Sequence, residues 1–284
     1  MRWTGPSGWA TGWIRPTAGT IRKAEAKRWR SRRKGLEAEP MTPSAAAPSA
    51  PAGPKPYDPA KLLISLHIPK TAGTSFRTIL GGWFGERLHN HYPGWPTPLT
   101  RTEAQADACV HGHFTRRNNS AIRQYYPDAE QVITVMRDPF DRIISEWRFK
   151  NMLKTAGDPV DEMDDDPSFD TWFGRRADEV AEQPITRLMM QMPNDLTPET
   201  AHTAFDRDFV AVGVSERFPE TLRLFAAVLG KPEAADERTN VTTYGQASDY
   251  EAYRSRHEQV FHSDHAMYAA ARAMFERQIA DLGL

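Results

Sequence analysis

The sequence predicts an α/β domain with a mostly parallel central sheet flanked by helices, following a segment of different composition. Apolar runs typical of buried strands alternate with segments whose apolar residues recur at helical spacing. Three of the predicted strands end in short polar loops. Such alternation indicates a parallel sheet covered on both faces, which binds its ligands at the carboxyl ends of the strands.

The first 58 residues differ from the rest of the chain in charge and composition. Residues 1–58 hold 11 Lys and Arg against 4 Asp and Glu, whereas residues 59–284 hold 25 against 33. A basic, tryptophan-containing stretch is followed from Met41 by a Pro/Ala-rich stretch, and neither composition can bury a core. We therefore expect a disordered basic and Pro/Ala-rich extension at 1–58 and one domain at 59–284. A nucleic-acid or membrane-surface arm, or sequence upstream of a true start at Met41, are the alternatives for the basic part.

The first half of the domain begins with a strand, a small-residue loop and a helix. Residues 62–67 form an apolar run, and Phe76, Ile79 and Leu80 have the spacing of a helix over 74–84. Glycines and prolines predict a loop over 82–100. The stretch 106–114, ADACVHGHF, contains a short strand that ends in two histidines, and 118–126 is a predicted helix closed by Pro127.

The second half repeats this alternation. The β-branched stretch QVITVM predicts a strand that ends before Asp138, and Pro139 suits the first turn of the next helix. An acidic loop follows, whose aspartates do not have the spacing of a calcium-binding loop. The remaining predictions are helices near 168–180, 184–191 and 198–205, a strand at 208–213, and helices at 216–229 and 257–282.

The loop after the first strand has the residues of a phosphate site. Small residues at Ala72 and Gly73 let a ligand approach the backbone, and the amides from Ala72 to Ser75 would lie unpaired at a helix N-terminus. Thr71, Thr74 and Ser75 add hydroxyl groups, and Lys70 adds a flexible point charge. The alternative is an ordinary helix start beside an exposed lysine.

A second basic group follows the strand at 131–136. Arg137 comes directly after this strand, and Ser145 lies about two turns into the next helix, so the two can hold a second phosphate. The alternative is a surface salt bridge from Arg137 to Asp138 or Asp141, a contact that contributes little to stability.

The two stretches together resemble the sulfotransferases that use 3′-phosphoadenosine 5′-phosphosulfate (PAPS). The stretch PKTAGTS, residues 69–75, is similar to the loop that binds the 5′-phosphosulfate in that superfamily. RDPFDRIIS, residues 137–145, is similar to the stretch whose Arg and Ser bind the 3′-phosphate. The resemblance covers about residues 61–275 and implies a P-loop-like three-layer sandwich. It also implies PAPS as donor substrate, held by Lys70, Thr71, Ala72, Gly73, Thr74, Ser75, Arg137 and Ser145.

The histidines sharpen the resemblance. HGH, residues 111–113, resembles a motif of the uronosyl (heparan sulfate) 2-O-sulfotransferases, in which the second histidine is the proposed base. VGVSE at 212–216 and, weakly, RTNVTTYG at 238–245 also resemble that carbohydrate branch. The resemblance therefore implies His113 as the base, with His111 and Lys70 as further catalytic residues. A histidine with an ordinary pKa near 6.5 is largely neutral at pH 7 and suits this task. His67, directly before the loop, is a weaker candidate.

Several classes of protein fit the sequence less well. A P-loop kinase or NTPase needs Gly-Lys-[Ser/Thr], but here the lysine precedes the glycine, and the strand ends in an arginine. A non-catalytic domain that binds a nucleotide or a glycan would keep the loops without needing the base. Lys70 supplies a cation, so we expect no metal. The acidic domain disfavours nucleic acid and highly anionic glycans as partners.

The expected setting is the bacterial cytoplasm. Golgi members of the superfamily carry a membrane anchor and disulfides, whereas this sequence has the single Cys109 and no apolar run of about 20 residues. The expected acceptor is a hydroxyl of a carbohydrate or a related compound; its identity, the position sulfated and the oligomeric state stay open.

Overall fold

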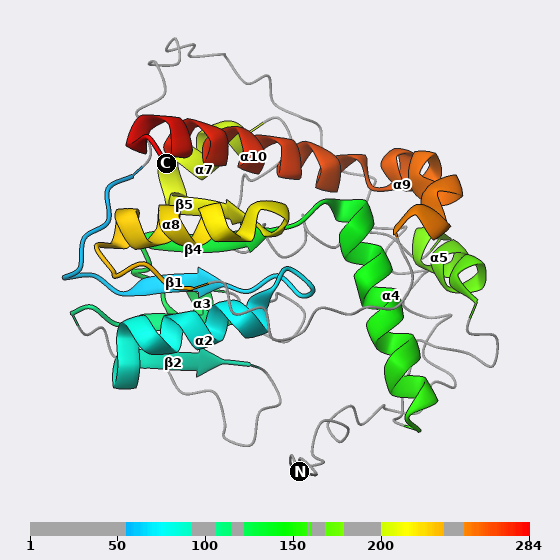
Figure 1. The fold of residues 1–284 in the computed structure, drawn as a ribbon, viewed down its shortest axis with the longest axis horizontal. Coiled ribbons are helices and arrows are strands. Elements are labelled where there is room, and N and C mark those ends of the chain that lie inside the picture. The colour runs from blue at the N-terminus through cyan, green and yellow to red at the C-terminus, as the bar shows by residue number, and fades with distance from the viewer. Residues whose placement is uncertain are drawn as a thin grey trace, which may run out of the picture. The chain divides into compact units, whose positions relative to one another are not determined.

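The fold is a parallel α/β sandwich. The structure is a computed structural model that describes residues 55–92, 106–114, 122–157, 160, 168–178, 200–235 and 247–284. The strands it contains are β1 (Leu63–Leu66), β2 (Leu88–His91), β3 (Cys109–Gly112), β4 (Gln131–Met136) and β5 (Phe209–Val214). All neighbours are parallel, in the order β2-β3-β1-β4-β5 (Figure 1). The predicted α/β class is confirmed.

Helices cover both faces of this sheet. The helices in the described ranges are α2 (Gly73–Phe84), α3 (Ile122–Tyr125), α4 (Pro139–Thr155), α5 (Phe169–Asp178), α7 (Ala201–Asp208), α8 (Phe218–Leu229), α9 (Arg254–Val260) and α10 (His262–Leu282). Short 3₁₀ turns lie at η1 (Gly85–Arg87), η3 (Ser215–Arg217) and η4 (Ala247–Tyr253). In Figure 1, α2 and α8 lie in front of the sheet and α3 lies behind it. Phe76 of α2 and Phe225 of α8 are in contact, with ring centroids 5.2 Å apart.

The last helix covers the open edge of β5. The buried side-chain amide of Gln278 on α10 donates to the carbonyl of Val210 at 2.8 Å and accepts from the amide of Val212 at 3.4 Å. Thr221 of α8 accepts from the amide of Val214 at 2.9 Å. These side chains satisfy backbone groups that an edge strand would otherwise leave unpaired.

A second apolar cluster lies beyond the carboxyl ends of the strands. Helix α4 leaves β4 and packs with η4 and α9, and its Trp147 contacts Phe169 of α5; Figure 1 shows α4 beside α5 and α9. The buried members of this cluster are Phe140, Ile143, Ile144, Phe169, Trp172, Phe173 and Phe261. The cluster holds α4, whose Phe149 ring centre lies 4.0 Å from the ammonium of Lys70; Ser145 is on the same helix.

Two elements differ from the sequence-based expectation. The prediction of a loop throughout 82–100 is wrong, because Leu88–His91 forms β2. This strand has little apolar signal, and it depends on its pairing with β3 and on His91, which stacks on Phe114 with ring centroids 4.4 Å apart. The helix predicted at 257–282 is divided at Phe261, whose φ of −107° and ψ of 32° interrupt it. The interruption lets Phe261 enter the second apolar cluster while α10 follows β5.

The segment just before the predicted domain boundary is bonded to the domain. Gln131, 1% exposed, accepts from the amide of Asp58 at 2.6 Å and donates to its carbonyl at 3.0 Å. Tyr57 packs against the main core. Residues 55–58 therefore take part in the fold. The rest of the predicted extension, the predicted helix at 184–191 and the stretch 238–245 lie outside the described residues.

Candidate functional site

The lysine loop joins β1 to α2 through two unusual backbone conformations. Lys70 has φ 71° and Ala72 has φ 65°, in the left-handed region that non-glycine residues rarely occupy. The first helical bond runs from the amide of Phe76 to the carbonyl of Ala72 at 3.0 Å. The amides of Gly73 and Thr74 precede this bond and lie at the positive end of the helix. Such strain is typical of sites where the backbone must meet a ligand.

The side chains of the loop divide into structural and available groups. Thr71 is buried, and its hydroxyl donates to the carbonyl of Ile68 at 2.8 Å, which closes the loop on itself. Ser75 is buried as well, whereas Thr74 is exposed. The ammonium of Lys70 lies 4.0 Å from the ring centre of Phe149 on α4. Burial, followed by repulsion from Arg137, lowers the pKa of Lys70 to about 8.

Arg137 is held beside this loop. It follows β4 directly, and its guanidinium donates to the carbonyl of Lys70 at 3.4 Å. Within the described part of the chain Arg137 makes no ion pair, although its charge counteracts the raised pKa of Asp141; both Asp138 and Asp141 face Arg254, at 3.7 and 3.9 Å. Two cations thus lie close together without a carboxylate on either. An anion would relieve their mutual repulsion.

Other contacts fix the turn that carries Arg137. The Asp138 carboxylate caps α4 by accepting from the amides of Phe140 and Asp141, each at 3.0 Å. The amide of Asp138 donates to Glu216 at 2.8 Å, and Tyr268 of α10 donates to the same carboxylate at 3.1 Å. The sequence indicated Glu216 only as a member of the VGVSE motif and predicted no role for it. Its structural role is to hold the turn in which Arg137 lies.

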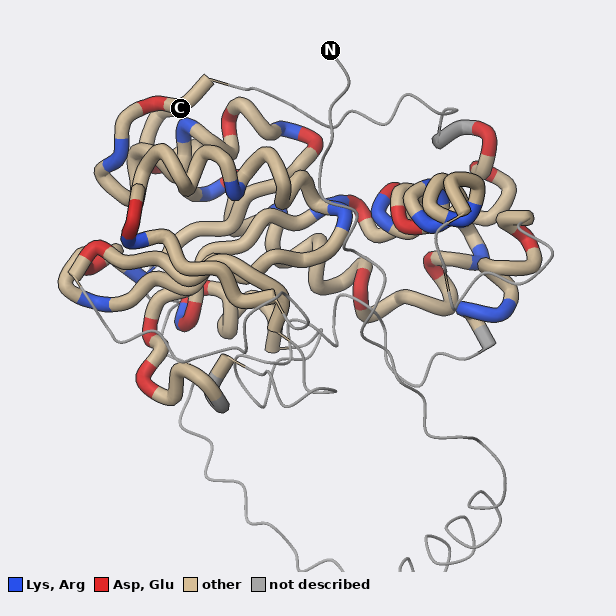
Figure 2. Tube along the Cα trace, turned by 90° about the horizontal axis from the view of Figure 1, so that it is seen from below, with Lys and Arg blue, Asp and Glu red and all other residues tan. Residues whose placement is uncertain are grey.

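Ser145 lies on α4, part-exposed, next to a buried charge network. The neighbouring Glu146 accepts from Arg142 at 3.0 Å and Lys150 at 3.0 Å, and from Arg176 of α5 at 3.2 Å. Burial alone would raise the pKa of Glu146, but these three cations lower it to about 2. Figure 2, which looks along α4, shows basic residues around this helix. Glu146 therefore balances the charge of Arg142, Lys150 and Arg176, and it also counteracts the lowered pKa of Lys70 without forming an ion pair with it.

The histidines lie in register at the carboxyl ends of three adjacent strands. Leu66 of β1, Gly112 of β3 and His91 of β2 are partners. The amide of His67 donates to Gly112 and that of His113 to His91, both at 2.9 Å, which extends the ladder by one row. His67 and His113 are therefore neighbours in one row, and Tyr92 follows β2 beside them. His111 points to the same face two residues earlier, because side chains alternate along a strand.

The imidazoles form one buried cluster. The His67 ring stacks on His111 at 5.1 Å and lies 4.5 Å from His113. His111 Nδ1 bonds the hydroxyl of Ser65 at 2.9 Å. Within the described residues, Nε2 of His113 is buried without a hydrogen-bond partner, whereas His111 also has the Gly73 backbone as a neighbour, which counteracts the lowering of its pKa. Buried polar atoms are rarely left unpaired, so Nε2 of His113 requires a ligand, a water or a neighbour.

Burial also sets the charge of this cluster. It lowers the pKa of His113 to about 4 and, together with the charges of His113 and Arg77, that of His111 to about 3. Burial and then the two other histidines lower the pKa of His67 as well. All three rings are neutral at pH 7, which is the form that can accept a proton.

The close packing of β3 against β2 explains why the middle residue of HGH, Gly112, is a glycine. A Cβ at this position would lie 1.9 Å from the carbonyl oxygen of His91 on β2. Only glycine lets β3 approach β2 closely enough for the histidine on either side of it to reach the cluster.

Lys70, Arg137 and the three histidines thus lie at one edge of the sheet. Lys70 and Arg137 share a hydrogen bond, α4 brings Phe149 to Lys70, and His67 connects the lysine loop with the HGH histidines. The roles assigned to these residues stay predictions. In the described ranges no group of three or more His, Cys, Asp or Glu is arranged to hold a metal ion. Nor is any helix there long and apolar enough to cross a membrane.

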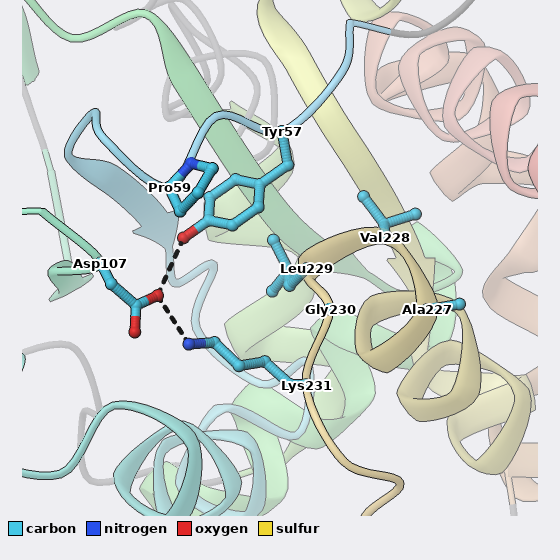
Figure 3. A pocket seen from close by; sticks show the side chains of 8 residues that line it. All are labelled: Tyr57, Pro59, Asp107, Ala227, Val228, Leu229, Gly230 and Lys231. Atoms are coloured by element: carbon cyan, nitrogen blue, oxygen red, sulfur yellow. Dashed lines mark hydrogen bonds and ion pairs between the residues drawn. The ribbon is translucent and has the colours of Figure 1, made fainter.

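An open hollow of about 590 Å³ lies at the opposite edge of the sheet, beside Tyr57, Asp107 and Lys231 (Figure 3). Asp107 precedes β3 with φ 53° and accepts from Lys231 at 2.6 Å, from Arg87 at 2.7 Å and from the Tyr57 hydroxyl at 3.3 Å. These polar groups satisfy one another, which indicates a structural clasp. The amino-edge clasp, as we name these four residues, is therefore not the candidate site.

Comparison with known proteins identifies a family for this chain. A model of the sulfotransferase family matches residues 57–269, most of the chain. Among solved structures, the crystal structure of mouse sulfotransferase SULT7A1 complexed with PAP is similar. The two chains are 10% identical, with 76% of this chain and 89% of that chain covered and a TM-score of 0.48. No curated protein sequence matches. On the extent of the family match, the chain belongs to the sulfotransferase family.

Proposed function

We propose that this protein is a PAPS-dependent O-sulfotransferase that moves a sulfuryl group to a hydroxyl of a carbohydrate or a related acceptor. The pair formed by Lys70 and Arg137 carries the proposal. Both cations lie at the carboxyl edge, where Arg137 donates to the carbonyl of Lys70, and neither forms an ion pair with a carboxylate among the described residues. The neutral His67 ring adjoins the lysine loop and contacts His113, whose Nε2 has no hydrogen-bond partner among the described residues. Cations suit an anionic donor, and a neutral imidazole suits an acceptor hydroxyl.

The lysine loop and Arg137 would hold the donor. The amides at the start of α2 and the ammonium of Lys70 suit the 5′-phosphosulfate, and Arg137 with Ser145 suits the 3′-phosphate. As the acceptor oxygen bonds to sulfur, the sulfur–oxygen bond to the 5′-phosphate breaks and charge develops on that phosphate. Preorganised donors stabilise developing charge more than they stabilise the ground state. Lys70 and the loop amides would therefore accelerate the reaction.

His113 would take the proton of the acceptor hydroxyl, with His111 as its neighbour. Because its pKa is lowered to about 4, the ring is neutral throughout the range above pH 5. The acid limb of kcat/KM should therefore lie near pH 4, lower than an ordinary histidine would give. Lys70 must keep its proton, and its pKa of about 8 predicts a fall in kcat/KM above that pH. The expected setting stays cytoplasmic, in line with the single buried Cys109.

Ligand binding tests the donor part of this proposal. Adenosine 3′,5′-bisphosphate should raise the melting temperature, because a ligand at about 100 times its Kd adds roughly 2.7 kcal/mol of stability. ATP with Mg²⁺ should raise it far less. Arg137→Ala should reduce affinity for the bisphosphate about 10–100-fold but leave that for adenosine 5′-phosphate nearly unchanged, as expected for a lost charge-assisted contact.

A matched control separates the site from net charge. Arg207→Ala removes one positive charge from an exposed arginine that already pairs with Asp208 at 2.8 Å. Its affinity for both nucleotides should equal that of the parent. If Arg137→Ala behaves like Arg207→Ala, or if ATP stabilises the parent as much as the bisphosphate does, the proposed donor site is wrong.

A further inference from the structure

His67 lies between the lysine loop and the HGH histidines, and it is fixed from two sides. Its amide donates to the carbonyl of Gly112 at 2.9 Å, which holds its backbone in the sheet ladder. Its Nδ1 bonds the hydroxyl of Tyr92 at 3.0 Å, which fixes the orientation of the ring. The ring planes of His67 and His111 are only 14° apart, and the ring of His113 is tilted by 47°. The imidazole is therefore held in one place by described contacts.

The far side of the same ring occupies the space above Gly73. A Cβ at position 73 would lie 1.7 Å from Nε2 of His67, 2.2 Å from Cδ2 and 2.3 Å from Cε1. The sequence suggested that Gly73 lets a ligand approach the backbone. In the structure His67 makes that approach. Gly73 does not have a positive φ, so the reason for glycine here is space and not backbone conformation.

We propose that His67, anchored by Tyr92, is a positioning residue that sets the separation between the base His113 and the donor-binding lysine loop. One rigid ring touches the first residue of α2 on one side and both HGH histidines on the other. Packed interiors transmit small displacements, because they contain few voids into which a side chain could move. A shift of the ring would move the base and the loop relative to each other. This inference rests on the proposed sulfotransferase function.

The environment of His113 gives a measurement that a purely structural role would not change. The titratable groups around its ring are His67, His111 and Tyr92, and Arg77 of α2 acts on the last two and on His67. Burial is what lowers the pKa of His113 to about 4. Removal of the His67 ring would admit water and raise that pKa toward 6.5. A base must be deprotonated to act, so the acid limb of kcat/KM would move to higher pH.

A double-mutant cycle tests the contact without any ligand. Gly73→Ala should lower the melting temperature, although alanine is otherwise favoured in a helix. His67→Ala with Gly73→Ala should recover most of that loss, because the collision is gone. Gly82→Ala on the same helix is the matched control: an added Cβ there has nothing within 4 Å, and it should not lower the melting temperature.

The parent, Gly73→Ala, His67→Ala and the double variant are then compared in ligand affinity and turnover. Gly73→Ala should bind adenosine 3′,5′-bisphosphate at least tenfold more weakly, and the double variant should regain most of that affinity. His67→Ala alone should bind the bisphosphate within a few-fold of the parent, while kcat falls at least tenfold and the acid limb rises from about pH 4. Tyr92→Phe should also lower kcat and raise the acid limb. His67→Asn, which can still bond the Tyr92 hydroxyl, should have a higher kcat than His67→Ala.

The outcomes separate this inference from the proposed function. If the parent binds the bisphosphate but the double variant melts and binds no better than Gly73→Ala, His67 does not position the loop and the inference is overturned. An unchanged acid limb in His67→Ala also overturns it. If the parent does not bind the bisphosphate, the proposed function fails. The melting temperatures of the double-mutant cycle then still test the contact between His67 and Gly73. A higher melting temperature in the double variant than in Gly73→Ala supports the contact, and an equal one overturns it.

Discussion

The two edges of the sheet use charged residues in opposite ways. At the amino edge, the strained Asp107 is matched by Lys231, Arg87 and Tyr57, so each polar group has a partner. At the carboxyl edge, the strained lysine loop brings Lys70 next to Arg137, and neither has a carboxylate partner among the described residues. Strain alone therefore does not mark the site. Unmatched charge together with unpaired buried nitrogens does, because folding does not by itself favour either.

The largest expected effect is on catalysis at the carboxyl edge. His113→Ala should lower kcat about 10²–10⁴-fold, the usual contribution of a general base, with little change in bisphosphate affinity. The measurement is turnover with radiolabelled PAPS across a panel of hydroxyl acceptors, with product identified by mass. The panel would also identify the acceptor.

A control at the same edge sharpens this result. His91→Ala removes a histidine that lies on the other face of the sheet, stacked on Phe114. It should affect stability more than kcat. Full turnover in His113→Ala would place the base elsewhere, with His111 and His67 as the next candidates. A parent that binds the bisphosphate but modifies no acceptor would favour a binding domain.

The next effect is on stability and concerns Glu146, the carboxylate that pairs with three cations at the carboxyl edge. Its pKa lies at about 2 in the folded protein against 4.5 ordinarily, so the folded state holds its proton less tightly than the unfolded state does. Its contribution, of order a few kcal/mol, is present above about pH 4.5 and lost as pH falls toward 2. Urea unfolding at pH 7 and pH 3 should show this loss.

Glu146→Gln is the corresponding variant. It should be less stable than the parent at pH 7, because three cations lose their carboxylate, and the gap should narrow at pH 3. An equal gap at both values would contradict the assignment. Glu220→Gln is the control, since Glu220 pairs with Arg217 in a half-exposed ion pair and should change stability little at either pH.

The smallest effect concerns the amino edge. A protein that starts at Lys55 should melt as the full chain does, if residues 1–54 form an extension outside the fold. A protein that starts at Pro59 loses the Tyr57 hydroxyl bond to Asp107 and both bonds between Asp58 and Gln131. We expect it to be less stable by about 1–3 kcal/mol, or several degrees in melting temperature.

The bisphosphate should raise the melting temperature of both truncated proteins equally, because the amino-edge clasp lies at the other end of the strands. A smaller shift in the shorter protein would show that the two edges are coupled. Equal melting of the two would show that residues 55–58 contribute nothing to stability, and would support the boundary expected from the sequence.

The sequence by itself determined the fold class and the segments that meet at the carboxyl edge. Alternating strands and helices imply a parallel sheet, and a parallel sheet brings the residues after its strands to one edge, so Lys70, Arg137 and His113 could be placed together without coordinates. Even the shared face of His111 and His113 follows from the two-residue period of a strand. These are local rules, and they need only the order of residues along the chain.

Only the tertiary structure decided which of these groups have partners. Whether Arg137 pairs with Asp138 depends on Arg254, more than a hundred residues later, and β2 exists only because β3 pairs with it. The sequence assigned Gly73 to a ligand because nothing in the loop shows that His67 fills that space. Strand register and helix packing bring such distant residues into contact. Burial, charge balance and lowered pKa values follow from those contacts and cannot be read from the spacing of residues.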